Sequence, residues 1–254
     1  MRTFITILCL VSSLFLAAQE NHLDIELDHL GHIYSIKGNE LKKYTPEGKI
    51  TSNYSDPLLG EITSIDVSNP LRLQLFYKES NLLLYLDQYL APIVDPIDLY
   101  TYSENETHLL CDAASGGFWI YNSEDNQAFQ ISRQGELRNK SLLLVGYFKE
   151  RLPSKMKEHH EGLYFLIPSR GILILNKFGQ FQQEIHLPGI TNFCFNNQAV
   201  LYQKDRTWFK YNPSLGEDTL IFEQKDSGDC QSKIRADQIY IFCGDQISIK
   251  KLSL

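Results

Sequence analysis

The feature of this sequence that most limits its fold is a unit of two short apolar strands joined by a tight polar turn, which occurs six times. The six units are Ile33–Tyr44, Leu73–Leu86, Leu109–Tyr121, Leu163–Leu175, Ala199–Tyr211 and Ile239–Ile249. Their turn residues are spaced by 42, 36, 54, 35 and 39 residues. Most of these spacings lie near the roughly 40 residues of one four-stranded propeller blade. The repeat therefore predicts an all-β fold, a single β-propeller of six four-stranded antiparallel blades.

The segments before these units support the same fold. Several of them, such as residues 23–28 and 190–196, alternate between apolar and polar residues and end in Asp or Asn, which favour turns. The 14 Tyr and 14 Phe residues also favour strands. Two alternatives remain open, a pair of β-sandwiches and a five-bladed propeller. The last unit reaches Leu254 after about three strands, so the strand that would close the ring is not identified.

A family resemblance rests on two stretches of the repeat. The run from Asp28 to Lys49, with its Gly-His-Ile-Tyr and Thr-Pro-Glu-Gly-Lys segments, resembles one repeat of an NHL-type or SMP-30-type β-propeller. Residues 171–189 resemble the later half of another repeat. The resemblance implies the propeller architecture. It implies much less about activity, because one fold carries many functions.

The N-terminus predicts export. Arg2 precedes an apolar segment, Phe4 to Leu16, and Ala17-Ala18 supplies the small residues of a signal peptidase site. We therefore expect a signal peptide at residues 1–18 and one β-propeller domain at residues 19–254. The apolar run is short for a membrane span. We expect a protein that is not transmembrane and works in the periplasm, at the outer membrane or outside the cell.

The charge of the chain argues against nucleic-acid binding. The formal net charge is −7, and removal of residues 1–18 leaves 23 Lys and Arg against 31 Asp and Glu, or −8. Nucleic-acid binding relies on basic patches. Motifs of hydrolases, P-loop proteins and EF-hands are also missing, and no cofactor is indicated.

Three sets of residues are candidates for metal binding or recognition. An SMP-30-type lactonase would need carboxylates and an Asn at a metal in the channel, and Asp66, Asp112 and Asn196 lie near strand ends. His29 and His32 with His22, or His159-His160-Glu161, are possible transition-metal ligands. The aromatic segments Phe118-Trp119, Trp208-Phe209 and Tyr100-Thr101-Tyr102 could stack on a sugar or a partner. The simpler interpretation is that the Asp and Asn residues form turns, that the histidines lie in solvated loops, and that the aromatic residues pack in the core between blades. We therefore predict no metal site.

The cysteines predict one disulfide. If Ala236-Asp237 is a two-residue turn, Arg235 pairs with Gln238 and Cys230 lies opposite Cys243 in a non-hydrogen-bonded pair. Such a pair has a Cα–Cα distance of about 4.5 Å, which a disulfide can bridge. Cys111 and Cys194 are expected two blades apart, as buried thiols.

The 54-residue spacing predicts an insertion in the fourth blade. We place it at residues 149–161, between expected strands Leu142–Phe148 and Leu163–Ile167. The charged and apolar residues of this loop make it the candidate partner-binding site: Lys149, Arg151, Leu152, Lys155, Met156, Lys157, His159 and His160. Leu152 and Met156 would form its apolar anchor. A solvated loop without function is the alternative.

Three classes of function are compatible with these patterns. The first is a non-catalytic propeller that binds protein partners as a scaffold of a bacterial envelope complex, in assembly or secretion machinery. The second is a small-ligand or glycan binder at the channel mouth, and the third is a metal-dependent lactonase or esterase. An apolar patch on a flat face or on the rim favours the first class. Exposed aromatic side chains at the channel mouth favour the second, and clustered carboxylates favour the third.

Overall fold

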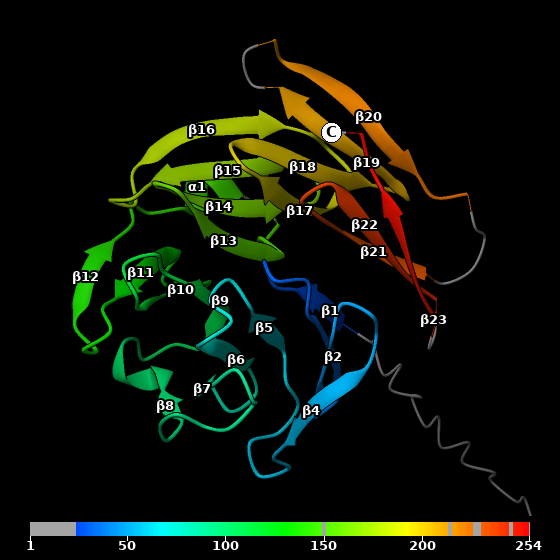
Figure 1. The fold of residues 1–254 in the computed structure, drawn as a ribbon. Coiled ribbons are helices and arrows are strands. Elements are labelled where there is room, and N and C mark those ends of the chain that lie inside the picture. Colours follow the sequence, from blue (N-terminus) through cyan, green and yellow to red (C-terminus); the bar gives the residue numbers. More distant parts are fainter. Residues whose placement is uncertain (1–23, 149–150, 213–214, 226–229, 244–245, 254) are drawn as a thin grey trace, which may run out of the picture.

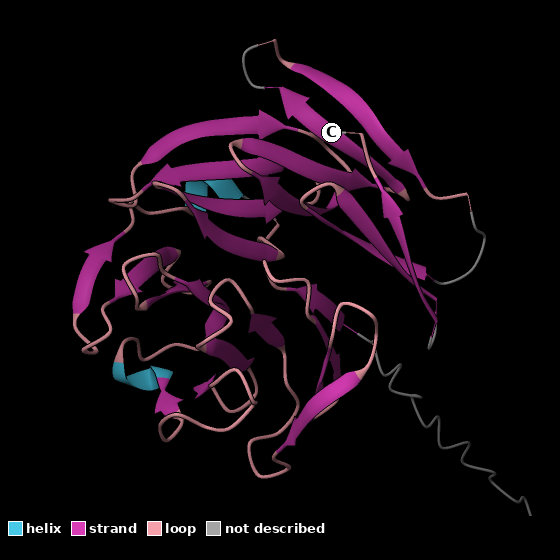
Figure 2. Cartoon of the chain, viewed as in Figure 1, coloured by secondary structure: helices cyan, strands magenta, loops and turns pink. Residues whose placement is uncertain are grey.

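The computed structural model describes residues 24–148, 151–212, 215–225, 230–243 and 246–253. These residues form six antiparallel sheets around a central channel (Figure 1). The described ranges are almost entirely strand and loop, and their helices are the single turns η1 (Leu99–Thr101) and α1 (Val145–Phe148) (Figure 2). The predicted six-bladed propeller is thereby confirmed. Residues 1–18, which carry the predicted signal peptide, lie outside the described residues.

Each blade consists of strands that follow one another in the chain. Blade one consists of β1 (Asp24–Leu27), β2 (Ile33–Lys37), β3 (Glu40–Tyr44) and β4 (Ile50–Ser55). Blade two consists of β5 (Ser64–Asp66), β6 (Leu73–Tyr77), β7 (Leu82–Leu86) and β8 (Ile97–Asp98). Blade three consists of β9 (Thr107–Asp112), β10 (Phe118–Asn122), β11 (Gln127–Ile131) and β12 (Leu137–Lys140). Blade four consists of β13 (Lys155–His159), β14 (Gly162–Ile167), β15 (Gly171–Asn176) and β16 (Phe181–His186). Blade five consists of β17 (Ile190–Asn196), β18 (Ala199–Lys204), β19 (Thr207–Asn212) and β20 (Glu217–Glu223). The described strands of blade six are β21 (Cys230–Arg235), β22 (Gln238–Cys243) and β23 (Gln246–Lys251).

The core is divided into six apolar layers, one between each pair of neighbouring blades. Two buried tryptophans also join blades through their indole N–H groups. Trp119 of blade three donates to Glu158 of blade four at 3.1 Å, and Trp208 of blade five donates to Ser232 of blade six at 3.0 Å. The burial of apolar side chains between blades therefore stabilises the ring, and each of these two tryptophans adds one polar contact.

Among the described strands, none is exchanged between the first and last blades. Blade one is built from the first four described strands, and the sheet of blade six has three. Ile25 and Ile33 of blade one pack against Tyr240 and Phe242 of blade six. This apolar layer joins the first blade to the last.

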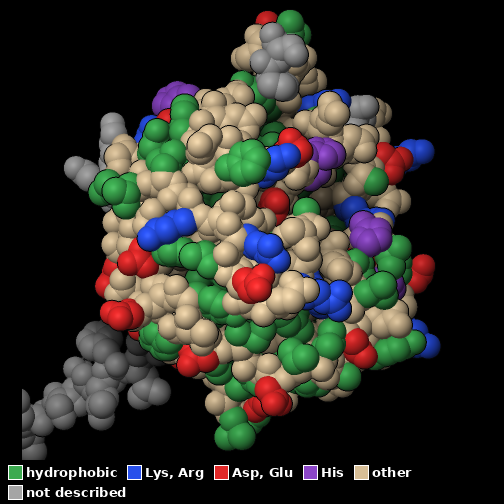
Figure 3. Space-filling view, turned by 90° about the vertical axis from the view of Figure 1, so that its left-hand side faces the viewer, with side chains coloured by type: hydrophobic (Ala, Val, Ile, Leu, Met, Phe, Trp, Pro, Cys, Tyr) green, Lys and Arg blue, Asp and Glu red, His purple; other side chains and the backbone are tan. Residues whose placement is uncertain are grey.

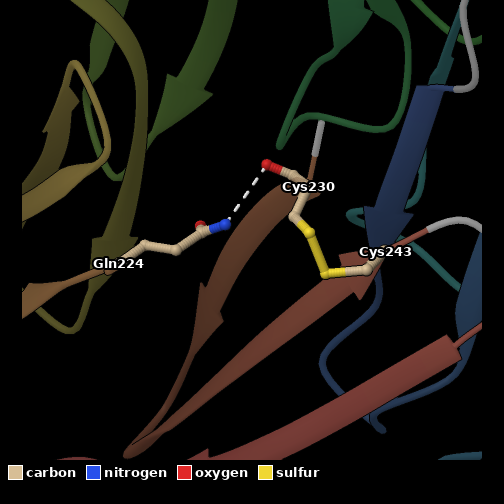
Figure 4. The surroundings of a disulfide bond; sticks show 3 residues. All are labelled: Gln224, Cys230 and Cys243. Carbon is tan, nitrogen blue, oxygen red and sulfur yellow. Dashed lines mark hydrogen bonds between the residues drawn. A yellow bond between two sulfur atoms is a disulfide. The ribbon is translucent and has the colours of Figure 1, made fainter. Parts of the chain in front are cut away.

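The predicted disulfide is confirmed, and it lies in this three-stranded blade (Figure 4). Arg235 pairs with Gln238 beside the two-residue turn, and Cys230 pairs with Cys243 at a Cα–Cα distance of 4.4 Å. Gln224 donates to the carbonyl of Cys230 at 3.5 Å. The bond ties β21 to β22 in the blade that has the fewest strands.

The remaining thiols lie two blades apart, as predicted. Cys111 is on β9 and Cys194 is on β17, the innermost strands of blades three and five. Cys111 is buried and Cys194 is partly buried. Burial raises the pKa of Cys111 well above its ordinary value and the pKa of Cys194 to about 12, so both are protonated thiols at neutral pH.

The structure corrects the strand order of blade three. The unit Leu109–Tyr121, expected to hold the second and third strands of a blade, contains the first and second, β9 and β10. The turn between the second and third strands contains Asn126, which has a φ of 52° and lies 45 residues after Asn81 and 44 before Arg170 in the equivalent turns. The 54-residue spacing was therefore a register error and not an insertion at residues 149–161.

Candidate functional site

The central channel is lined by the innermost strands of the blades and widens into two cavities of about 380 Å³ and 340 Å³. The first cavity includes residues at the beginnings of these strands, such as Ser64 and Asn192, and the second includes residues at their ends, such as His159 and Ala236. The two share a charged middle region that we call the channel cluster: Glu26, Lys155, Lys157, Asn192 and Lys233.

Strand alternation places these side chains in the channel. On β13, Lys155 and Lys157 line the channel, while Met156 between them is 3% exposed and packs in the layer between blades three and four. Glu26 on β1, Asn192 on β17 and Lys233 on β21 join them from other blades. A polar channel wall thus alternates with an apolar layer between blades.

The channel cluster is an ion network centred on Glu26. The Glu26 carboxylate lies 3.1 Å from Lys233 Nζ and 3.7 Å from Lys155 Nζ. Lys155 also donates to the side-chain oxygen of Asn192 at 2.7 Å. Lys157 lies 3.8 Å from Asp66, whose carboxylate accepts the backbone N–H groups of Ser68 and Asp112. The network joins charges from four of the six blades, and Asn192 adds a neutral amide from a fifth.

The pKa values in the network follow from the competition between burial and neighbouring charge. Burial alone would raise the pKa of Glu26, but Lys233, Lys155 and Lys157 outweigh it and hold that pKa well below its ordinary value. Burial lowers the pKa of Lys155 to about 8, since Lys233 and Lys157 offset the attraction of Glu26. Burial also acts on Lys157 and Lys233, yet their nearby carboxylates keep both pKa values raised. Lys155 is the lysine with the weakest compensation.

The predicted partner-binding loop at residues 149–161 is in part a strand in the structure. Residues 155–159 form β13, and Lys155 and Lys157 face the channel. Met156 is buried, so it cannot form an exposed anchor with Leu152, which is 46% exposed. Lys149 lies outside the described residues.

The rest of that segment also differs from the prediction. Arg151 is exposed and follows α1, and residues 142–148 do not form the expected strand. His159 stacks on Phe195 with ring centroids 3.9 Å apart, and His160 lies in the turn after β13 with a φ of 51°. The longest connection between blades is residues 141–154, which precedes β13.

Asp66 and Asp112 are neighbours, since the Asp112 N–H donates to the Asp66 carboxylate at 3.2 Å, but the candidate metal ligands in the described part of the chain do not form one site. Asp66 is bound to Lys157, Asp112 lies 2.9 Å from Arg72, and Asn196 donates to the carbonyl of Ala236. His32 contacts Asp28 at 2.9 Å within a turn, where Asp28 also accepts the N–H groups of Leu30 and His32. His22 is outside the described residues. Within the described ranges, no three His, Cys, Asp or Glu side chains are placed to hold a metal ion.

The aromatic segments divide between core and surface. Phe118, Trp119 and Trp208 are core residues with at most 2% exposure. Phe209 stacks on Tyr202 at 5.3 Å. Tyr100 is exposed, while Tyr102 is partly buried and meets Phe118 edge to face at 5.6 Å.

Tyr102 and Phe118 belong to a cavity of about 250 Å³ that we call the blade 2–3 pocket. Its walls are lined by Arg72, Tyr85, Ile93, Val94, Ile97, Tyr102, Phe118, Ser132, Arg133 and Gly135. Ile93 and Val94 are 47% and 50% exposed. The pocket therefore combines aromatic walls with an apolar, solvent-facing rim.

The polar side of the pocket is held in place by Arg72. Its guanidinium lies 4.9 Å from the Tyr85 ring centroid, pairs with Asp112 and donates to the carbonyl of Gly116. Its Nε is buried and has no hydrogen-bond partner in the described part of the chain. Burial raises the pKa of Tyr85 to about 12, so its phenol stays protonated at neutral pH.

The rim segment is held by its own hydrogen bonds. Asp87 accepts the N–H groups of Tyr89 and Ala91 at 2.8 and 2.9 Å, and Ile93 donates to the carbonyl of Tyr85. On the side of the molecule that carries β8 and β12, hydrophobic side chains gather in several groups between single charged ones (Figure 3). This side thus offers apolar surface on a rigid support.

Sequence reasoning missed this pocket as a site. It singled out Tyr102 and Phe118 as aromatic residues, but nothing near them in sequence indicates Arg72, Ile93 or Arg133. Four connections and three strands of two blades supply the pocket, so only the packing of the blades brings these residues together.

Comparison with known proteins gives the fold and no family. No family model matches the chain, and no curated protein matches it. Solved structures do match. A streptogramin B lyase structure is 13% identical, with a TM-score of 0.59, and the match covers 91% of this chain and 83% of that one. The chain is similar in fold to a β-propeller.

Two further matches show how widely the architecture is used. The WD40 domain of Pan2 from Neurospora crassa is 11% identical, with a TM-score of 0.56, covering 89% of this chain and 78% of that one. BBS1N, solved in complex with ARL6DN, is 14% identical, with a TM-score of 0.56, covering 90% and 77%. The neighbours thus include an enzyme and interaction domains, and these identities carry the fold alone. No described helix is both long and apolar enough to cross a bilayer.

Proposed function

We propose that this protein is exported and acts as a non-catalytic scaffold that binds a protein partner of a bacterial envelope complex through the blade 2–3 pocket. The observation that carries the proposal is the pocket itself, with three aromatic side chains inside and Ile93 and Val94 exposed at its rim. Exposed apolar residues around a preformed cavity are typical of sites that take an anchoring side chain of a partner.

The chemistry of the pocket suits a partner segment that is apolar with an acidic group beside it. A volume of about 250 Å³ accommodates one large side chain. Arg133 is exposed at the pocket, and the buried Arg72 adds a second positive charge. We therefore expect the partner to insert an aromatic or branched aliphatic side chain and to place a carboxylate near Arg133.

Two further observations support the location and the class. A disulfide is typical of proteins that fold outside the cytoplasm, which agrees with the predicted signal peptide. In the channel, Glu26 and Asp66 are engaged by lysines, and Asp112 is engaged by Arg72. A binding role on the rim is favoured over metal-dependent hydrolysis in the channel.

The proposal predicts that Val94→Asp in the mature protein lowers partner capture from solubilised envelopes at least tenfold, because a carboxylate at the rim opposes insertion of an apolar group. Leu58→Asp is the matched control, since Leu58 is 92% exposed and lies outside the pocket. Captured proteins are quantified by mass spectrometry, and circular dichroism checks folding. Equal capture by wild type and both variants would count against the pocket as the binding site.

A further inference from the structure

The channel cluster contains one more buried cation than it has buried anions to match. Lys155, Lys157 and Lys233 have side-chain exposures of 20%, 20% and 14%, and the carboxylates of low exposure within 4 Å of them are Glu26 and Asp66. A third carboxylate, Asp24, is 47% exposed and lies 3.9 Å from Lys233. Because Asp24 is half exposed to solvent, its attraction to the lysines is more screened than that of Glu26.

The excess charge falls on Lys155. Lys233 has Glu26 at 3.1 Å, and Lys157 has Asp66 as its counter-ion. Lys155 is 3.7 Å from Glu26, and its close contact is the neutral amide oxygen of Asn192 at 2.7 Å. An ammonium group carries three donors, and a buried one needs anionic or strongly polar acceptors. Lys155 therefore has donor capacity beyond its one short contact.

We propose that the channel end bounded by Ser64, Ser154 and Asn192 binds a small oxyanion, a carboxylate or phosphate group, with Lys155 as its main ligand and Lys233 as the second cation. The cavity at this end has a volume of about 380 Å³, enough for such a group and a short attached chain. Ser64 and Ser154 line the same cavity with Lys155 and supply hydroxyl donors of the kind that oxyanions accept.

The position of the site separates it from the blade 2–3 pocket. The two cavities have no lining residue in common. Anion binding in the channel is therefore independent of the proposed partner contact, and either can fail without the other. The depressed pKa of Lys155, about 8, has the same physical origin as the site, because incomplete compensation of its charge is what an anion would correct.

Calorimetric titration of the mature protein at pH 7 with inorganic phosphate and with acetate tests the proposal. Sodium chloride at equal ionic strength corrects for screening. We expect saturable binding of at least one oxyanion, and the arm that responds tells phosphate from carboxylate recognition. Failure of both oxyanions to bind beyond chloride would overturn the proposal.

Three variants assign the binding to Lys155. Lys155→Gln should weaken the binding at least tenfold, and Lys155→Arg should retain it because the charge is kept. Lys177→Gln is the surface control, since Lys177 is 46% exposed and pairs with Glu161. Binding to Lys155→Gln with wild-type affinity would overturn the assignment. Retained binding by Lys155→Arg shows that a substitution at this position does not by itself disrupt the fold of the site.

Discussion

Replacement of Glu26 by alanine is expected to lower the free energy of unfolding by about 3–5 kcal/mol, as found when one partner of a buried ion pair is removed. Glu26 is the carboxylate on which Lys233 and Lys155 converge, at 3.1 and 3.7 Å. Without it, the carboxylates still within 4 Å of the three lysines are Asp66, beside Lys157, and the half-exposed Asp24, beside Lys233. Chemical denaturation at pH 7 measures the loss.

The matched control is Glu161→Ala. Glu161 also contacts a lysine, Lys177, at 2.7 Å, but its side chain is 77% exposed. Surface ion pairs contribute about 0–1 kcal/mol, so the control should change little. If Glu26→Ala costs no more than Glu161→Ala, the channel cluster does not stabilise the ring.

The pH dependence of the Glu26 effect has a defined sign. The pKa of Glu26 is lowered on folding from its ordinary value of 4.5, so its stabilising contribution is fully present above about pH 4.5. This contribution is lost as the pH falls toward the folded-state value. The difference in stability between wild type and Glu26→Ala should therefore shrink on acidification below pH 4.5, and a difference that grows there would contradict the network.

Loss of the disulfide is the second large effect. Replacement of both Cys230 and Cys243 by alanine should lower the free energy of unfolding by about 3 kcal/mol, the typical value for a closed loop of about 15 residues. The cysteines are 13 residues apart. They join two strands of blade six, which has three described strands in place of four. Local unfolding of this blade would also separate it from blade one, because the two blades share an apolar layer.

Reducing agent provides the internal control for the disulfide. Wild-type protein under reducing conditions should unfold at the denaturant concentration of the double variant. The double variant should not respond to reductant, because Cys111 and Cys194 are free thiols. A wild-type midpoint that stays unchanged after both sulfurs are shown to be reduced would contradict a stabilising role.

The sequence predicts the ring and the disulfide for a physical reason. Strand alternation and turn chemistry are local, and they repeat from blade to blade. The register Cys230–Cys243 follows from one turn, Ala236-Asp237, by counting along two strands. Such predictions need no knowledge of how the blades pack.

The predictions for blades three and four were wrong where the polarity of a segment differs from what its secondary structure usually shows. Lys155, Lys157 and Glu158 made β13 look like a loop, but they line a polar channel or face the neighbouring blade. The apolar segment 142–148 looked like a strand, yet Leu144 and Phe148 are buried four residues apart beside exposed Val145, which is helical spacing. Hydrophobic pattern alone does not separate these cases.

The central claim is that the rim of the blade 2–3 pocket meets a partner protein in the cell envelope. The most direct measurement places a photo-crosslinking amino acid at Val94 in the exported protein and illuminates intact cells. Leu58 serves as the control position, because its side chain is 92% exposed, against 50% for Val94, and it lies outside the pocket. The account predicts one crosslinked product of defined mass from position 94 and none from position 58, with the product lost when Ile93 is replaced by Asp. No product from position 94, or the same products from both positions, would contradict it.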